Sequence, residues 1–130
     1  MATLLNLAAR LLLAQIFLLS GIGKISAYAS TQAYMAAAGV PGILLPLVII
    51  LEIGGALALI LGFQTRLVAL LMAGFSLATG LLFHTHFADP TQQIMFMKNL
   101  AIAGGFLLLV QHGASAPSLD ERLHRQGQEI

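Results

Sequence analysis

Charged side chains are scarce in this sequence. Only 8% of its 130 residues are Asp, Glu, Lys or Arg, whereas about 25% is usual for a soluble globular domain. A soluble domain of this size shows a polar surface to water, and six basic plus five acidic residues are too few to form one. Because 58% of the residues are hydrophobic, we expect lipid to surround most of the chain.

Cysteine is absent. This absence excludes disulfide exchange, thiolate metal ligation and cysteine-bound iron–sulfur clusters within the chain, and it argues against the quinone-linked thiol oxidases, whose mechanism needs paired thiols. The basic residues are few and scattered, and the net charge is only +1. No basic stripe is available to follow a phosphate backbone, so we expect no nucleic-acid partner.

The sequence is dominated by long apolar runs. A transmembrane helix needs about 20 mostly apolar residues, and four stretches meet this requirement. They are residues 4–23, 41–63, 67–83 and 94–111. They predict an all-α protein, a four-helix transmembrane bundle. A cleaved signal peptide is the alternative for the first stretch, but Lys24 interrupts that pattern and the distance to a small-residue cleavage site is long.

Two further segments are predicted beside the spans. Between the first two spans we expect a short interfacial helix, with Ser30 or Thr31 as its N-cap and Gly39 at its end. The last part of the sequence is polar. We therefore divide the chain into a four-span membrane domain, residues 1–113, and a polar C-terminal tail, residues 114–130, which is either frayed or a short surface helix.

The distribution of basic residues predicts the orientation in the membrane. Four spans place both termini on the same side, together with Arg66, Arg122 and Arg125, whereas Lys24 and Lys98 belong to the other side. An excess of Lys and Arg is typical of the cytoplasmic side. We therefore expect both termini to be cytoplasmic.

One carboxylate, that of Glu52, stands among aliphatic side chains in the stretch "VIILEIGGALAL". An ionised carboxylate in lipid is costly unless it is paired or neutralised. Arg10 lies about 6 Å from the midplane of the first span, at about 1.5 Å per residue, and we expect it to pair with Glu52 if the two spans are neighbours. Gln15 is near enough to join this network. The pair is consistent with two roles, a structural contact between helices and a protonatable or ligand-binding centre.

A second polar group is expected at the membrane face opposite the termini. Lys24 ends the first span, His84 ends the third, and Lys98 with Asn99 begins the fourth. These side chains converge from three spans on one mouth, where they suit an anion or the polar head of an amphipathic ligand. Snorkelling explains the lysines without any function, and a helix cap or an interface position explains the histidine.

Metal and hydrolase chemistry find little support. His84 and His86 are two residues apart, which does not suit one face of a helix, and His112 belongs to the other membrane face. We therefore expect no metal site and no haem site. Ser20 and Ser76 lack a matched histidine and carboxylate, so no hydrolytic triad is expected.

Five segments of the sequence stand out in this order: "SGIGKI", "YMAAAGVPG", "LEIGGALALILGFQTR", "LLFH" and "MFMKNLAIAGGFLLL". Together they resemble the bacterial DoxX family, specifically its short, stand-alone inner-membrane members, over nearly the whole chain. The resemblance implies a four-helix integral membrane protein. The family is named after a subunit of an archaeal thiosulfate:quinone oxidoreductase, and other members are associated with membrane oxidoreductase complexes, detoxification and oxidative-stress responses. The resemblance singles out seven positions: Arg10, Lys24, Glu52, Arg66, His84, Lys98 and Asn99.

The resemblance and the interior ion pair together imply a membrane subunit of a redox or detoxification system that binds a quinone-like or other small amphipathic molecule. In this interpretation Glu52 exchanges a proton or hydrogen-bonds the ligand, Arg10 holds Glu52 in place, and His84, Lys98 and Asn99 shape the entrance. No flavin, nicotinamide or metal motif is present, so electrons would come from an oxidoreductase partner protein or a diffusible carrier such as quinone. Whether the chain is itself an enzyme stays open.

Two alternatives remain. A small transporter for a hydrophobic solute also places buried charges beside a cavity, and with only four spans it would need a homodimer. A membrane scaffold needs the ion pair only as a structural contact between helices.

Overall fold

The computed structural model describes residues 1–129, in which every regular element is a helix and no strand is present. The helices are α1 (Ala2–Ser26), α2 (Tyr28–Ala37), the short 3₁₀ helix η1 (Gly42–Leu44), α3 (Leu45–Leu61), α4 (Thr65–Phe83), α5 (Pro90–His112) and α6 (Leu119–Gln128). Four helical segments are long and apolar enough to cross a membrane: Ala2–Ser26, Gly42–Leu61, Thr65–Phe83 and Pro90–His112. The prediction of an all-α, four-span bundle is therefore confirmed.

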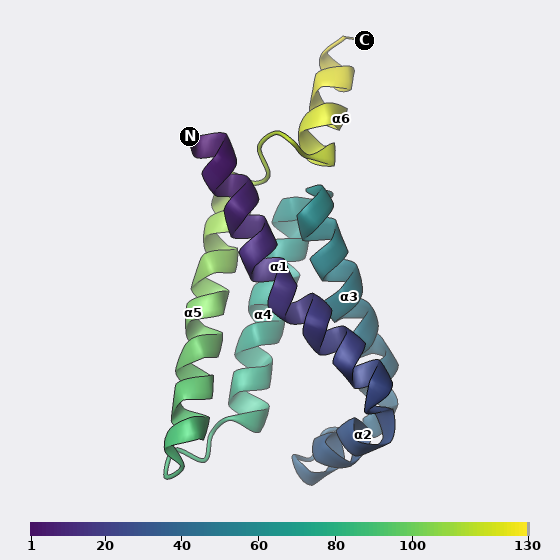
Figure 1. Cartoon of the computed structure of the whole chain (residues 1–130), viewed down its shortest axis with the longest axis vertical. Coiled ribbons are helices and arrows are strands. Elements are labelled where there is room, and N and C mark those ends of the chain that lie inside the picture. Colours follow the sequence, from purple (N-terminus) through teal and green to yellow (C-terminus); the bar gives the residue numbers. More distant parts are fainter. Residues whose placement is uncertain (130) are drawn as a thin grey trace.

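The four long helices form two pairs. α1 packs along α3, and α4 packs along α5, whereas α1 and α5 have little contact. The pairs meet where α3 turns into α4, and they diverge toward the end where α2 lies (Figure 1). We call this open end the loop face, because it carries α2 and the α4–α5 loop. The opposite end, which carries the N-terminus and α6, is called the terminal face (Figure 1).

Glycine allows the helices to approach closely at two points of the bundle. A Cβ atom on Gly21 of α1 would lie 2.6 Å from Cγ1 of Ile53 on α3. A Cβ atom on Gly55 of α3 would lie 2.8 Å from Sδ of Met72 on α4. Since hydrophobic association is weak inside a bilayer, helices there are held mainly by close contacts of this kind. Gly21 therefore fixes the register of α1 against α3.

The helix between the first two spans is present, as α2. It ends at Ala37, and the chain turns at Gly39, whose φ of +80° is accessible to glycine without strain. The predicted N-cap, however, is wrong. Ala27 alone separates α1 from α2, and its carbonyl already accepts the backbone N–H of Thr31. The chain continues from one helix into the next, so Ser30 and Thr31 lie inside the first turn of α2 and donate their hydroxyls to the same carbonyl.

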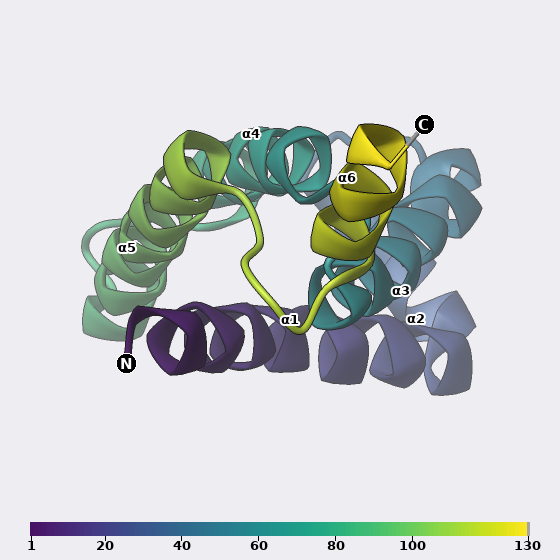
Figure 2. The same cartoon turned by 90° about the horizontal axis from the view of Figure 1, so that it is seen from above.

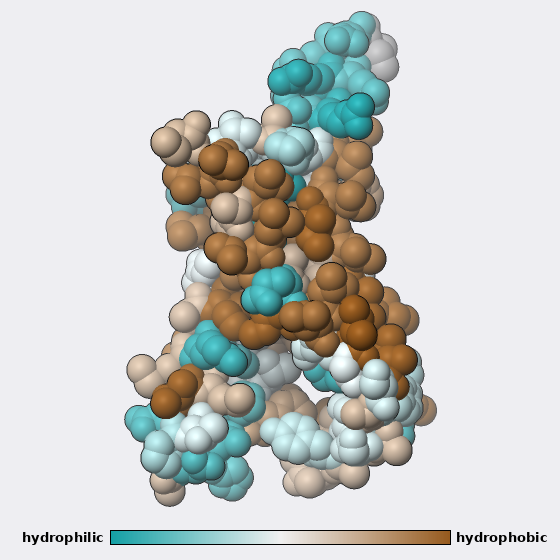
Figure 3. Space-filling model, in the orientation of Figure 1, coloured by the Kyte–Doolittle hydropathy of each residue, from teal (hydrophilic) through white to brown (hydrophobic). Residues whose placement is uncertain are grey.

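The C-terminal tail is docked on the terminal face and then continues as a helix. The linker from α5 runs across this face to α6 (Figure 2). α6 then extends away from the bundle (Figure 1). The side chain of Ser118 accepts the backbone N–H of Glu121 and so caps α6. α6 is hydrophilic, in contrast to the apolar surface of the bundle (Figure 3). This contrast matches a bundle within the lipid and a helix outside it.

Candidate functional site

A cavity of about 490 Å³ lies between the two helix pairs and reaches the loop face. Its size is within the range of about 300–1,000 Å³ that is usual for small-molecule sites. The hollow is visible toward the loop end of the space-filling view (Figure 3). Apolar side chains such as Phe17, Phe75 and Ile102 form most of its wall. Polar side chains interrupt this wall, among them Ser20, Lys24, Glu52, Ser76, His84, Lys98 and Asn99.

Glu52 is neutralised by Lys24. Nζ of Lys24 lies 2.7 Å from Oε1 of Glu52, and the glutamate side chain is only 2% exposed, against 26% for the lysine. The short distance between opposite charges makes this contact an ion pair, and within residues 1–129 Oε1 accepts no hydrogen bond. The ammonium group instead donates to Oγ of Ser20, 2.6 Å away. Because Gly21 brings α1 against α3 at Glu52, Lys24 is placed one turn further along α1, within reach of the carboxylate.

The predicted pair between Arg10 and Glu52 is wrong. Arg10 is fully buried, and its guanidinium donates to the carbonyls of Leu59, 3.3 Å away, and Pro117, 2.8 Å away. The antiparallel register places Gly21 beside Glu52, and Arg10 is about three turns, or about 16 Å, further back along α1. Arg10 therefore lies level with the last turn of α3 and holds the C-terminal segment.

Gln15 does not join a polar network either. The buried residues of α1 include Arg10, Ala14, Phe17 and Gly21, so these positions mark the face that points into the bundle. Gln15 is exposed on the opposite face. The earlier expectation considered only distance along the helix, whereas the direction of the side chain decides its partners.

The polar residues expected at the mouth do lie together. Lys24, His84, Lys98 and Asn99 line the same cavity as Glu52. Asn99 also joins α5 to α4, because its Nδ2 donates to the carbonyl of Ser76 and to Oγ1 of Thr79, each 3.0 Å away. A hydrogen bond of 2.9 Å joins His84 Nδ1 and Gln92 Oε1 and orients the ring. The structure thus provides one polar site, whose binding of a ligand stays a prediction.

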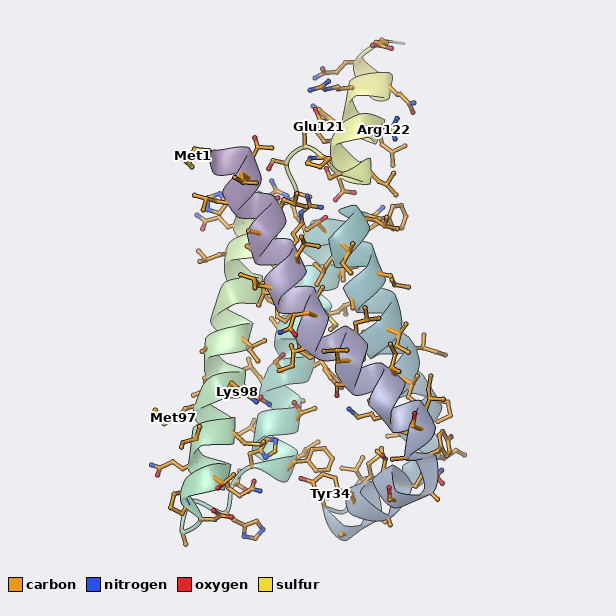
Figure 4. The ribbon with its side chains drawn as sticks, in the orientation of Figure 1. Met1, Tyr34, Met97, Lys98, Glu121 and Arg122 are labelled. Atoms are coloured by element: carbon orange, nitrogen blue, oxygen red, sulfur yellow. The ribbon has the colours of Figure 1, made fainter. Side chains whose placement is uncertain are left out.

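Two polar groups of this cavity have no partner within residues 1–129. Ser76 is 1% exposed, and its hydroxyl makes no hydrogen bond. Lys98 makes no ion pair. Its side chain leaves α5 toward α4 and the cavity, whereas the neighbouring Met97 points away from the bundle (Figure 4). From the sequence, Ser76 was considered only as a hydrolase nucleophile; its place within an apolar span puts the hydroxyl at membrane depth but does not show which helix face it occupies.

An aromatic pair crosses the mouth of the cavity. Tyr34 of α2 and Phe83 at the end of α4 stack with ring centroids 5.2 Å apart and an angle of 17° between their planes. Both residues line the cavity, and Tyr34 lies at the open end of the molecule (Figure 4). The contact joins elements that are far apart in the chain, so the sequence does not predict it.

The terminal face has different chemistry. Arg66 lies there beside Gly113, away from the central cavity, in a smaller cleft of about 340 Å³ with His112 and His124. Within residues 1–129, no group of three or more His, Cys, Asp or Glu side chains is arranged to hold a metal ion. Of the positions that the resemblance singled out, Arg10 and Arg66 therefore belong to the terminal face, and the other five belong to the cavity.

Comparisons with known proteins agree with this architecture. Residues 5–85 match the family model described as DoxX. The chain is 54% identical over 120 residues to the inner membrane protein YqjF of Escherichia coli K12, with 92% of each chain covered. It is 38% identical over 126 residues to the inner membrane protein YphA of the same strain, covering 91% of this chain and 89% of that protein. No solved structure gives a significant match.

Proposed function

Because the chain belongs to the DoxX family of membrane proteins, we propose that its central cavity binds a small amphipathic ligand of the quinone class, and that the protein is the membrane subunit of a redox or detoxification system. The observation that carries this proposal is the cavity itself. It is about 490 Å³ in volume, mainly apolar, and contains the Lys24–Glu52 ion pair at one wall. A site of this composition suits a ligand with an apolar body and one polar end.

The positions of the hydrogen-bond donors support a quinone-like head group. Such a head group has oxygen acceptors on opposite edges of its ring, and the cavity offers donors on two walls. Lys24 belongs to the α1–α3 pair, whereas Ser76 and Lys98 belong to the α4–α5 pair. The apolar body of the ligand would lie against Phe17 and Phe75, deeper in the bundle.

The ion pair supplies a route for protons. When a quinone is reduced to a quinol, each electron that enters is accompanied by one proton. In this proposal the Lys24 ammonium donates a proton to the reduced oxygen, the Glu52 carboxylate stabilises the ammonium form of Lys24, and the neutral amine left after transfer takes up a proton from water, to which the lysine side chain is 26% exposed. The electrons come from a partner oxidoreductase or a soluble reductant in this proposal. Glu52 therefore acts on proton transfer through Lys24, which takes the place of Arg10 as its counter-ion.

The terminal face argues for binding rather than permeation. Asn6 donates Nδ2 to the carbonyl of Gly113 at 2.9 Å and accepts the N–H of Ser115 at 3.0 Å. Arg10 holds the next residues through Pro117. The docked C-terminal segment covers this end of the bundle, so a solute that entered from the loop face would meet a closed end. A scaffold, in turn, has no need of a cavity with unpaired polar groups.

A cavity-filling substitution tests the proposal. Val48 on α3 lines the cavity, whereas Ile50, two residues away, is 68% exposed on the outside of the same helix. We expect decylubiquinone to bind the purified protein in equilibrium dialysis, Val48→Phe to weaken binding by at least about tenfold, and Ile50→Phe to leave it unchanged. The proposal fails if the unmodified protein binds no quinone, or if Val48→Phe binds as well as Ile50→Phe.

A further inference from the structure

The charges that line the central cavity do not cancel. Lys24 and Lys98 supply two cations, and Glu52 supplies one carboxylate. Lys24 and Glu52 lie 2.7 Å apart and neutralise each other. Lys98 has no counter-ion within residues 1–129. The cavity therefore holds one unpaired positive charge on the α5 side.

Lys98 lies in the first half of the membrane-spanning helix α5, and its side chain is exposed rather than buried in the bundle. It lies eight residues after Pro90, where the helix begins, which is about 12 Å along the axis. α5 contains no acidic residue over Pro90–His112, and the carboxylate of Asp89 is engaged as the N-cap of this helix. A cation at this depth is stabilised by a partner, by a polar cavity or by reaching the interface, and the side chain of Lys98 lines the cavity (Figure 4).

An unused hydroxyl lies on the neighbouring helix. Ser76 is 1% exposed and lines the cavity, and its Oγ has no hydrogen-bond partner. The backbone carbonyl of Ser76 accepts the side-chain amide of Asn99, the residue that follows Lys98, so Ser76 and Lys98 lie at a similar level of α4 and α5 and line the same cavity. A cation and a free hydroxyl are both donors. Together they match a negatively charged oxygen, since a neutral acceptor would leave the ammonium charge unbalanced.

From this juxtaposition we infer that the ligand is an amphipathic acid, whose ionised oxygen is bound by Lys98 with the Ser76 hydroxyl. The inference rests on the proposed function, because it specifies the head group of the ligand in the same cavity. Two sources share this chemistry, an acidic hydroxyquinone and a medium-chain carboxylic acid. In both, a single anionic oxygen group is attached to an apolar body that fits against the aromatic wall.

A matched pair of quinones tests the inference. 2-Hydroxy-1,4-naphthoquinone ionises, whereas its 2-methoxy ether has nearly the same shape and does not. We expect the purified protein in neutral detergent to bind the acid at least about tenfold more tightly than the ether. Lys98→Met should remove this preference and still bind the ether, Lys98→Arg should keep the preference, and Arg66→Met, at the other face, should change neither.

Decanoate and decanol form a second pair of an acid and its neutral analogue. Comparison of the two pairs shows whether the ligand is a hydroxyquinone or a carboxylic acid. A preference for decanoate without a preference for the hydroxyquinone supports the anion site and overturns the quinone assignment. Equal binding of acid and neutral analogue in both pairs overturns the anion site, while the binding that remains supports the cavity as a ligand site. A preference that survives Lys98→Met also overturns the role of Lys98. If no probe binds, both proposals fail.

Discussion

Lys24 and Glu52 form an ion pair across α1 and α3, with Nζ 2.7 Å from Oε1, on the wall of the central cavity. The two residues differ in their surroundings. The carboxylate is 2% exposed, whereas the lysine side chain is 26% exposed and also donates to Ser20. Removing the lysine charge should therefore affect stability differently from removing the glutamate charge.

Lys24→Met should destabilise the protein more than Glu52→Gln. The first change leaves a buried carboxylate without a counter-ion, and removal of one partner of a buried pair costs about 3–5 kcal/mol. The second leaves an ammonium group that still has Ser20 and access to the cavity. Thermal unfolding in detergent measures the difference.

The double variant Lys24→Met/Glu52→Gln completes a double-mutant cycle with the two single variants. We expect it to be more stable than Lys24→Met alone, because it contains no unpaired charge at this point. Lys98→Met is the matched control, since it removes a lysine from the same cavity that has no ion pair within residues 1–129. Equal stability of Lys24→Met and Lys98→Met would contradict the structural importance of the pair.

The contact between α1 and α3 depends on Gly21. A Cβ atom at this position would lie 2.6 Å from Ile53 and 3.3 Å from Cβ of Glu52, so Gly21→Ala must separate the helices or shift their side chains. We expect a loss of about 1–3 kcal/mol in the free energy of unfolding, as for other overpacked interiors. Gly23→Ala is the control, because nothing lies within 4 Å of the corresponding Cβ. Chemical denaturation of the two variants gives the comparison, and similar midpoints would be evidence against close packing at Gly21.

The spans and the interfacial helix could be predicted from the sequence, because each depends on local composition. Apolar runs of sufficient length define the spans, and Gly39 marks the turn that follows α2. The partner of Glu52 could not be predicted in this way. α1 has 25 residues and α3 has 17, and α1 crosses the bundle obliquely (Figure 1). Two residues that are equally far from the middle of their own helices therefore need not lie at the same depth in the membrane.

The polar mouth was predicted in part, because the order of the spans shows which of their ends lie on the same side of the membrane. Lys24, His84, Lys98 and Asn99 occur near the ends of three spans, and the connectivity alone assigns them to one side of the bundle. The Ser76 hydroxyl was missed, because one serine in an apolar span does not reveal which helix face it occupies. Arg10 was misassigned because its acceptors are backbone carbonyls, and these leave no signature in the sequence.

Gly62 is a further position at which an added methyl group should destabilise the protein. Its φ is +70°, and an added Cβ would lie 2.3 Å from Cβ of Ser118 and 2.5 Å from the Arg10 guanidinium. Gly62→Ala combines backbone strain of about 1–2 kcal/mol with displacement of the C-terminal segment. We expect faster hydrogen exchange and faster proteolysis in residues 113–120. Gly54→Ala, where the added Cβ meets nothing within 4 Å, should behave like the unmodified protein, and an equal response of the two variants would argue against docking of the tail at Gly62.

Arg10 should anchor the same segment without contributing to the cavity. Arg10→Met removes donors to Leu59 and Pro117, and hydrogen bonds that involve a charged group contribute about 1.5–3 kcal/mol each. The expected result is a released C-terminal segment, detected by limited proteolysis, together with unchanged affinity for decylubiquinone. Gln15→Met, on the exposed face of the same helix, serves as control. A large loss of quinone affinity in Arg10→Met would instead indicate that Arg10 acts on the cavity.

The stack of Tyr34 on Phe83 should control the rate of ligand exchange. The rings are 5.2 Å apart and join α2 to α4 over the mouth of the cavity, and such pairs contribute about 0.5–1.5 kcal/mol. Tyr34→Ala removes this link between the two halves of the mouth, so association and dissociation of decylubiquinone should both become faster, with a smaller change in affinity. Tyr28→Ala, in the same helix but outside the cavity lining, should leave both rates unchanged. Stopped-flow measurement of the two rate constants distinguishes a mouth contact from a binding contact, because loss of a binding contact would raise the dissociation rate alone.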